Sequence, residues 1–237
     1  MSSLQSRITA LVPVMDGWCS IEKANDLALA VIKSHASVSV EIGVWGGRSL
    51  IPMALAHQEQ NQGIVWAIDP WSSLASVEGY DAANSDWWGK QDHEMIYQRF
   101  LASARAHGVE KFIKIVRQKS DAIEPPPVID VLHVDGQHTE QAVRDVERFA
   151  SRVRVGGFCF VDDIGWSGGG PAAAVEKLLT MGFVKLFDRD TGAMFERQAA
   201  KVAKPAEPRK TKKVAKKIGR PAGSQSKPKA VAELVAS

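Results

Sequence analysis

Cysteine, tyrosine and long apolar runs are scarce in this sequence. Its only two cysteines, Cys19 and Cys159, lie far apart in 237 residues, which excludes a thiolate metal centre and a disulfide framework. Such buried thiols are typical of a reducing compartment, so a cytoplasmic protein is expected. No apolar run reaches the roughly 20 residues of a membrane-spanning helix, and residues 1–17 lack the apolar core of a signal peptide.

Two nucleotide-binding motifs are also missing. A dinucleotide-binding turn reads G-x-G-x-x-G, and a P-loop reads G-x-x-x-x-G-K-[ST]. Here Gly43 is followed by Gly46, Gly47 and Arg48, which matches neither pattern. An NAD-dependent oxidoreductase is therefore disfavoured, and a P-loop NTPase is excluded.

Negative charge is scarce at one end of the chain. Residues 199–237 contain eleven Lys or Arg and two Glu, a net charge of +9, whereas residues 1–198 carry −6. A segment rich in Lys, Ala and Pro and without aromatic residues cannot bury enough apolar surface to fold. We therefore expect an acidic folded body and a disordered basic tail with separate roles.

The body alternates short apolar runs with helical patterns, which predicts an α/β fold with a largely parallel sheet. Residues 1–36 are expected to be helical and either cover the mouth of a site or pack on the sheet. Residues 72–90 lack periodicity and predict a long loop, whose aromatic residues either wall a pocket or fix the loop to the core. Strands are predicted at 38–42, 63–69, 111–116, 128–134 and, after a turn at 155–157, 158–161, with helices at 91–107, 142–153 and 171–181 and a hairpin over 182–197.

Polar residues follow these strands, and parallel strands end at one edge of a sheet. The turn at Gly43 would let a ligand approach the backbone, and Glu41 beside it suits a ligand with an ammonium or sulfonium group. Asp69 follows the second strand, where a carboxylate can accept hydrogen bonds from both ribose hydroxyls. The alternative is that each residue belongs only to an ordinary turn or cap.

Three further carboxylates follow the fourth and fifth strands, at Asp135, Asp162 and Asp163. Carboxylates that converge repel one another unless a positive group lies among them. Oxygen ligands suit Mg²⁺ or another hard divalent cation rather than zinc. The alternative is that each aspartate only caps a helix or turn.

Together these motifs resemble the class I S-adenosylmethionine-dependent methyltransferases, in particular the metal-dependent small-molecule O-methyltransferases of the macrocin and catechol type. The matching residues are E-I-G-V-W-G-G-R-S at 41–49, D-G-x-H at 135–138 and G-G-x-x-x-x-D-D at 156–163. The resemblance implies a Rossmann-like seven-stranded sheet with helices on both faces. It divides the chain into an N-terminal helical cap (1–36), an S-adenosylmethionine-binding domain (37–198) and the tail (199–237).

The resemblance also assigns roles to residues. It implies methylation of a small-molecule hydroxyl with S-adenosylmethionine and Mg²⁺, with His138 and Asp135 as catalytic residues and Asp135, Asp162 and Asp163 as metal ligands. Gln137 and Thr139 depart from the family pattern around the histidine, which leaves the acceptor open. The expected cofactor-binding residues are Glu41, Gly43, Gly46, Gly47, Ser49, Asp69, Trp71, Ser120, Asp121 and Asp135.

The tail supports an alternative function. Lys216, Lys217, Gly219, Arg220 and Pro221 resemble an AT-hook, whose Gly-Arg-Pro core lies in the minor groove of A·T-rich DNA. A nucleic-acid-directed methyltransferase, or a DNA-binding module tethered through this tail, is therefore weighed against the small-molecule enzyme, and a merely solubilising tail stays open. The acidic body favours the small-molecule acceptor, and the sequence leaves a homo-oligomer open.

Overall fold

The structure, a computed structural model, describes residues 3–199 and contains one seven-stranded sheet. The strand order is β3-β2-β1-β4-β5-β7-β6, in which β7 runs antiparallel to β5 and β6. The expected seven-stranded α/β fold is confirmed. The strands are β1 (Val38–Ile42), β2 (Ile64–Ile68), β3 (Ile113–Val116), β4 (Ile129–Val134), β5 (Val153–Val161), β6 (Phe183–Arg189) and β7 (Gly192–Arg197).

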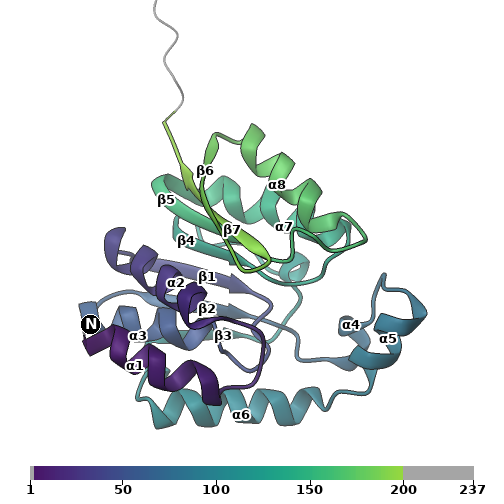
Figure 1. Cartoon of the computed structure of the whole chain (residues 1–237), viewed down its shortest axis with the longest axis horizontal. Helices are drawn as coiled ribbons and strands as arrows, with labels where there is room; N and C mark the ends of the chain where they lie inside the picture. Colours follow the sequence, from purple (N-terminus) through teal and green to yellow (C-terminus); the bar gives the residue numbers. More distant parts are fainter. Residues whose placement is uncertain (1–2, 200–237) are drawn as a thin grey trace, which may run out of the picture. The chain divides into compact units, whose positions relative to one another are not determined.

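Helices cover both faces of this sheet (Figure 1). Successive residues of each strand point to opposite faces, so one strand contributes side chains to two hydrophobic cores. In β4, Val131 packs in the core beneath α1, α2, α3 and α6, whereas Leu132 packs in the core beneath α7 and α8. The α-helices are α1 (Ser3–Leu11), α2 (Ile21–Lys33), α3 (Leu50–Gln60), α4 (Ser73–Ser76), α5 (Ala82–Gly89), α6 (His93–Ala106), α7 (Glu140–Phe149) and α8 (Gly170–Thr180).

The register of the sheet aligns the ends of its parallel strands. The backbone N–H of Gly43 donates to Ile68, and the N–H of Asp135 donates to Ile42. The N–H of Asp162 in turn donates to Val134. The residues that follow β1, β4 and β5 therefore share one edge, as expected for a parallel sheet.

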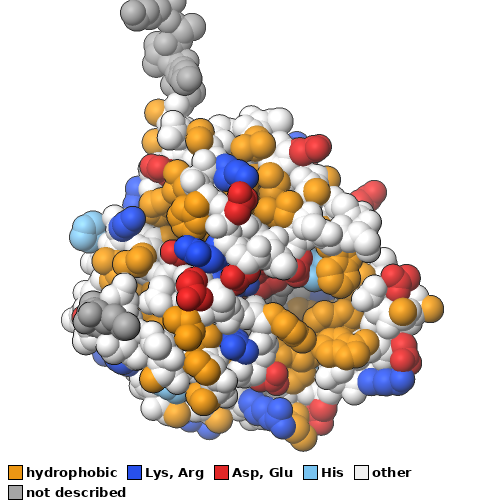
Figure 2. Space-filling view, in the orientation of Figure 1, with side chains coloured by type: hydrophobic (Ala, Val, Ile, Leu, Met, Phe, Trp, Pro, Cys, Tyr) orange, Lys and Arg blue, Asp and Glu red, His pale blue; other side chains and the backbone are white. Residues whose placement is uncertain are grey.

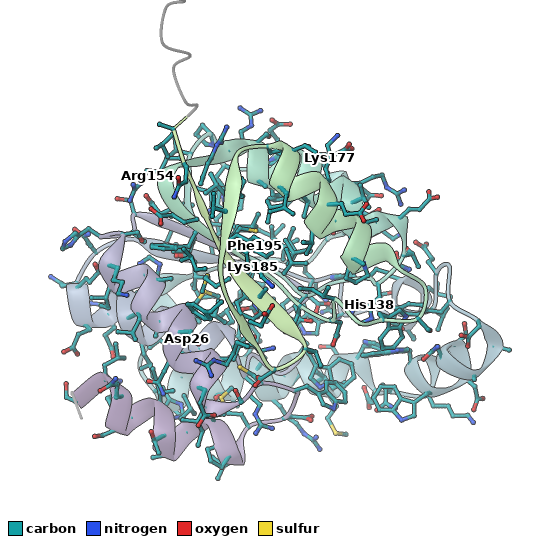
Figure 3. All side chains as sticks on the ribbon, turned by 45° about the horizontal axis from the view of Figure 1, so that its top comes forward. Asp26, His138, Arg154, Lys177, Lys185 and Phe195 are labelled. Atoms are coloured by element: carbon teal, nitrogen blue, oxygen red, sulfur yellow. The ribbon has the colours of Figure 1, made fainter. Side chains whose placement is uncertain are left out.

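Helix α2 is fixed over this edge by two contacts with the β6–β7 hairpin. Arg189 Nε donates to Asp26 Oδ2 at 2.6 Å, and the N–H of Ser20 donates to Asp190 Oδ2 at 3.3 Å. Ser20 is also the N-cap of α2, because its side chain accepts the N–H of Lys23. Asp26 accordingly lies on the side of α2 near the hairpin (Figure 3).

Two segments differ from the sequence expectation. Residues 72–90 contain the short helices α4 and α5, because the side chains of Ser72 and Asp81 cap their first turns. Strand β5 begins at Val153 and not at 158, since the expected turn at Gly156 is an irregularity within the strand, with a register shift opposite β4 and a φ of 76° at Gly156.

The tail predictions lie outside the described residues. This holds for the disordered segment and for the AT-hook-like residues 216–221. In the part of the chain that the structure describes, every helix is too short or too polar to cross a membrane.

Candidate functional site

A cavity of about 570 Å³ opens at the carboxyl edge of the parallel strands. Hydrophobic and acidic side chains surround the hollow in the space-filling view (Figure 2). Several of the expected site residues line it, namely Gly43, Ser49, Asp69, Ser120, Asp121, Asp135, His138, Asp162 and Asp163. Glu41, Gly46, Gly47 and Trp71 are not among the lining residues.

The glycines of the first turn make room for protein rather than for a ligand. A Cβ on Gly43 would lie 2.0 Å from the carbonyl oxygen of Asp135. A Cβ on Gly46 would lie 2.7 Å from the backbone oxygen of Asp16, and one on Gly47 would lie 2.6 Å from the Phe100 ring. The turn is glycine-rich because β4, the segment before α2 and helix α6 all pack against it.

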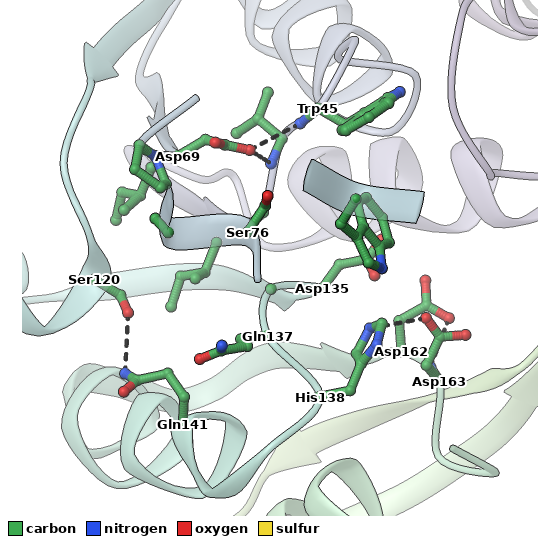
Figure 4. Close-up of a pocket in the computed structure, with 18 of the residues that line it drawn as sticks. Trp45, Asp69, Ser76, Ser120, Asp135, Gln137, His138, Gln141, Asp162 and Asp163 are labelled. Atoms are coloured by element: carbon green, nitrogen blue, oxygen red, sulfur yellow. Dashed lines mark hydrogen bonds and ion pairs between the residues drawn. The ribbon is translucent and has the colours of Figure 1, made fainter. Parts of the chain in front are cut away.

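Asp69 holds this turn in place. Its Oδ2 accepts the backbone N–H groups of Val44 and Trp45 at 2.9 and 3.0 Å, and its Oδ1 accepts the N–H of Trp71 at 2.7 Å (Figure 4). Burial raises the pKa of Asp69 above its usual value, against the lowering effect of these three donors. The carboxylate therefore shapes the wall of the cavity and also lines it.

Glu41 lies beneath the cavity and is fully buried. Its Oε1 accepts the hydroxyl of Ser49 at 2.9 Å, and its Oε2 lies 3.0 Å from His133 Nδ1. Both carboxylate oxygens are thus engaged by protein groups. The sequence suggested that Glu41 contacts a ligand's ammonium or sulfonium group directly. This arrangement does not support that contact.

The positive group among the strand-end carboxylates is Lys23, which the sequence analysis did not single out. Lys23 is only 3% exposed and reaches from α2 to the strand ends. Its ammonium group donates to Asp162 Oδ2 and lies 3.9 Å from Asp135 Oδ2. Burial disfavours the charged lysine, but Asp135 and Asp162 outweigh that effect and hold its pKa above the usual value.

The three carboxylates expected to share one metal ion are divided between two clusters. One comprises His133, Asp135 and Asp162, and the other Asp135, His138 and Asp163, with the ligand atoms of each within 4.8 Å of one another. Asp163 has a left-handed backbone (φ 50°), and its Oδ2 lies 3.0 Å from His138 Nε2. Asp162 and Asp163 thus face different partners.

The first cluster is a buried network of alternating charge. Burial raises the pKa of Asp162, but His133 and Lys23 more than compensate, so its pKa is lowered and it stays ionised. For Asp135, burial and then the nearby Asp162 charge raise the pKa well above its usual value. Buried charges are stable only when they are paired and hydrogen-bonded, as Asp162 is here.

His133 makes part of the protein's stability depend on pH. Burial lowers its pKa, but Asp162 and Glu41 together raise it to about 9, compared with about 6.5 for an unfolded histidine. Because the folded state binds this proton more tightly, the stabilisation is complete below about pH 6.5 and is lost as the pH rises through about 9. We expect the melting temperature to fall by several degrees over that range, measured by scanning fluorimetry. His133→Gln should flatten the decline, whereas His107→Gln, at the half-buried C-cap of α6, should retain it. Equal slopes in both variants would contradict the assignment.

The second cluster lies against aromatic side chains. The ring of His138 lies 4.4 Å from that of Trp166 and 6.2 Å from that of Tyr80, measured between centroids. The Tyr80 hydroxyl accepts the backbone N–H of His138. Neither ring nitrogen of His138 makes a well-aligned hydrogen bond among residues 3–199, but Nε2 lies 3.0 Å from Asp163 Oδ2, whereas Nδ1 has no such contact. The imidazole is thus oriented by Asp163 and packed between rings, with one nitrogen unengaged.

A hydrogen-bonded group forms the far wall of the cavity (Figure 4). Ser120 donates to Asp145 Oδ1 at 2.6 Å, and Gln141 donates to Ser120 Oγ at 3.2 Å. Burial raises the pKa of Asp145 to about 6, against these hydrogen bonds. Asp121 lines the cavity and is exposed, whereas Trp71 is buried and donates from its indole to the carbonyl of Trp45.

Four tryptophans meet at the mouth of the cavity. Trp18 lies 5.7 Å from Trp45 and from Trp87, and 6.0 Å from Trp88, between ring centroids. All four also line the cavity. The aromatic residues of segment 72–90 were expected either to wall a pocket or to fix the loop to the core. Its tryptophans do both, because they anchor the segment to other segments and also wall the pocket.

A sheet in this strand order, with one antiparallel strand and a glycine turn after β1, defines the class I methyltransferase fold. The chain belongs to the methyltransferase domain family Methyltransf_24, which it matches over residues 40–164. No curated protein sequence matches the chain significantly.

Solved structures share this fold at low sequence identity. The O-methyltransferase NovP is 17% identical, with a TM-score of 0.59, over 75% of this chain and 79% of NovP. TomG from Streptomyces achromogenes, an O-methyltransferase in complex with SAM, is 14% identical, with a TM-score of 0.56, over 84% of this chain and 91% of TomG. The SAH-bound methyltransferase PaMTH1 from Podospora anserina is 10% identical, with a TM-score of 0.56, over 84% and 89%.

Proposed function

We propose that this protein transfers a methyl group from S-adenosylmethionine to a hydroxyl group of a small molecule. One observation carries the proposal. The Gly43 turn and Asp69, where class I methyltransferases bind their cofactor, open into the same cavity as Asp135, His138 and Asp163. The structural likeness to TomG and NovP supports oxygen as the methylated atom.

The cavity walls suit the two ends of the cofactor. Asp69 Oδ1 accepts one hydrogen bond from the protein and has a second lone pair for a ribose hydroxyl. Ser120 and Asp121 line the far end, where they would contact the adenine. The sulfonium would then lie between Gly43 and Asp135, at the centre of the strand edge.

The chemical step is an in-line displacement. The hydroxyl oxygen of the acceptor forms a bond to the methyl carbon, and the bond from sulfur to that carbon breaks with its electron pair left on sulfur. The products are the methyl ether and S-adenosylhomocysteine. The hydroxyl proton passes to the His138 imidazole, whose cation the Asp163 carboxylate would stabilise at 3.0 Å. The site's main task is to align oxygen, carbon and sulfur.

The size and lining of the cavity favour a small acceptor. A volume of about 570 Å³ is in the usual range for a ligand pocket, and here it has to hold the cofactor as well. Trp18, Trp87 and Trp166 present apolar ring surface to the cavity. We therefore expect a compact hydroxylated acceptor with a flat apolar part.

A divalent cation held jointly by Asp135, Asp162 and Asp163 does not fit the residues present. The Lys23 ammonium already lies between Asp135 and Asp162, and Asp163 faces His138 instead. Methyl transfer in this site therefore has no step through Mg²⁺.

Binding and turnover of the full-length chain test this function. Calorimetry should show one S-adenosylhomocysteine per chain, with a dissociation constant on the order of micromolar. Incubation with S-adenosylmethionine and a panel of phenols, catechols and sugars should yield a methyl ether, detected by mass spectrometry. A chain that binds neither cofactor form would contradict the proposal, as would a methylated nitrogen in place of oxygen.

A further inference from the structure

Helix α2 places one lysine in its buried face. Residues 23, 27, 30 and 31 follow the helical spacing i, i+4, i+7 and i+8, and all four are buried. The last three are Leu27, Ala30 and Val31, so Lys23 occupies the end of an apolar stripe. A lysine is almost never fully buried unless it is paired, so the position calls for a partner at the strand ends.

The lysine has those partners and one donor to spare. An ammonium group carries three N–H donors. One is directed at Asp162 Oδ2 and one at the carbonyl oxygen of Trp18, 3.4 Å away. Asp135 Oδ2, at 3.9 Å, is close enough for charge attraction but beyond hydrogen-bond distance. Lys23 also lines the cavity, so its third N–H is available to a ligand oxygen there.

We propose that the Lys23 ammonium takes the place of a divalent cation in this site: it balances Asp135 and Asp162 and holds the oxygen of the acceptor, so that methyl transfer needs no bound metal. The inference rests on the proposed function. It deepens that function by naming the group that positions the acceptor, which makes Lys23 a binding residue and not a base.

Its surroundings fix this ammonium firmly. The ring of Phe160 lies 5.9 Å from the Lys23 Nζ, and His133 Nε2 lies 3.6 Å from the same Asp162 oxygen that Lys23 contacts. Asp162 Oδ1 is engaged separately, by the hydroxyl of Thr191 at 2.8 Å. A preorganised charge in a site with little water acts strongly on an oxygen that gains negative charge during the reaction.

The second cluster does not restore a metal site. Its carboxylates are Asp135 and Asp163, and Asp135 is shared with Lys23. A dication at Asp135 would lie close to the ammonium group and be repelled by it. Removing the ammonium would instead take away the cation shared by Asp135 and Asp162, so that a dication could bind to them.

The test is Mn²⁺ binding, followed by electron paramagnetic resonance, with full-length wild type, Lys23→Met and Lys33→Met. Met keeps most of the length of lysine without its charge, and Lys33→Met, on the exposed end of the same helix, is the matched control. We expect Lys23→Met to bind Mn²⁺ at least tenfold more tightly than wild type and Lys33→Met. Tight Mn²⁺ binding by the wild type would overturn the inference, and this arm needs no variant to fold.

Activity and cofactor binding give two further readouts. Wild-type turnover should be unchanged by a chelator. Lys23→Met should lose at least tenfold in kcat, with S-adenosylhomocysteine affinity within about threefold, and Mn²⁺ should restore part of that loss. Wild-type activity abolished by a chelator overturns the inference but leaves the proposed function standing. Failure to bind S-adenosylhomocysteine overturns the proposed function, while the Mn²⁺ comparison still reports on Lys23.

Discussion

Gly43→Ala is expected to lower the free energy of unfolding by more than about 4 kcal/mol and to abolish cofactor binding. The new Cβ would lie 2.0 Å from the carbonyl oxygen of Asp135 and 2.7 Å from the Cα of Gly136, both backbone atoms that cannot rotate away. The residue also has a φ of 84°, a conformation that costs a non-glycine residue about 1–2 kcal/mol. Either β1 or β4 has to move, and the cavity edge moves with it.

Denaturant unfolding and calorimetry measure both effects, with Gly165→Ala as the matched control. Gly165 is exposed, and a Cβ there would meet nothing within 4 Å. Its substitution should change stability by no more than about 0.5 kcal/mol. If Gly43→Ala proved as stable as Gly165→Ala and still bound cofactor, the close packing of β1 against β4 would be wrong.

Asp69→Asn and Asp162→Asn are expected to separate cofactor binding from turnover. An asparagine at 69 turns an NH₂ group toward backbone donors that the carboxylate now accepts, which costs about 1–3 kcal/mol and disturbs the turn. We expect the affinity for S-adenosylhomocysteine to fall by about a hundredfold, since each 1.4 kcal/mol is a factor of ten.

Asp162→Asn should act on the other half of the site. It removes the charge that anchors Lys23 and pairs with His133, so turnover should fall by more than about a hundredfold while the affinity for S-adenosylhomocysteine changes by less than about threefold. Calorimetry and initial rates measured on the same preparations give both numbers. An equal loss of cofactor affinity in the two variants would refute this division of the cavity.

The sequence pattern predicted the sheet and the carboxyl edge at which these polar residues meet, because both depend on local rules. Apolar alternation located β1, β2 and β4 to within a residue or two of their observed bounds. The parallel direction of those strands then required Gly43, Asp69 and Asp135 to share an edge. Helix α2 lies within the segment 1–36 that the sequence predicts to be helical.

What the pattern missed depends on contacts between distant segments. Lys23 and Asp162 are 139 positions apart, and nothing near Lys23 in sequence marks its partner. One signal was present: a lysine in register with Leu27 and Val31, on a face that otherwise carries apolar residues. His133 was hidden for a similar reason, since it lies within an apolar strand and its partner Glu41 is on the neighbouring strand.

The position of the glycine motif was predicted correctly, but the physical reason for its glycines was only partly apparent from the sequence. The cluster at Gly43, Gly46 and Gly47 marks a tight turn after β1, as expected. Its spacing cannot reveal that Asp16 and Phe100 come from elsewhere in the chain to fill the space above it. Only the three-dimensional packing shows which neighbour excludes a Cβ.

The anchoring of α2 to the β6–β7 hairpin has a consequence for how the protein is made. The ribosome synthesises Lys23 early, but Asp162 and the hairpin residues Arg189 and Asp190 that fix its helix emerge near the end of the folded body. A nascent chain that stops before the hairpin therefore leaves the lysine without the contacts that aim it. Prematurely terminated products should be inert even when they retain the whole cofactor-binding half.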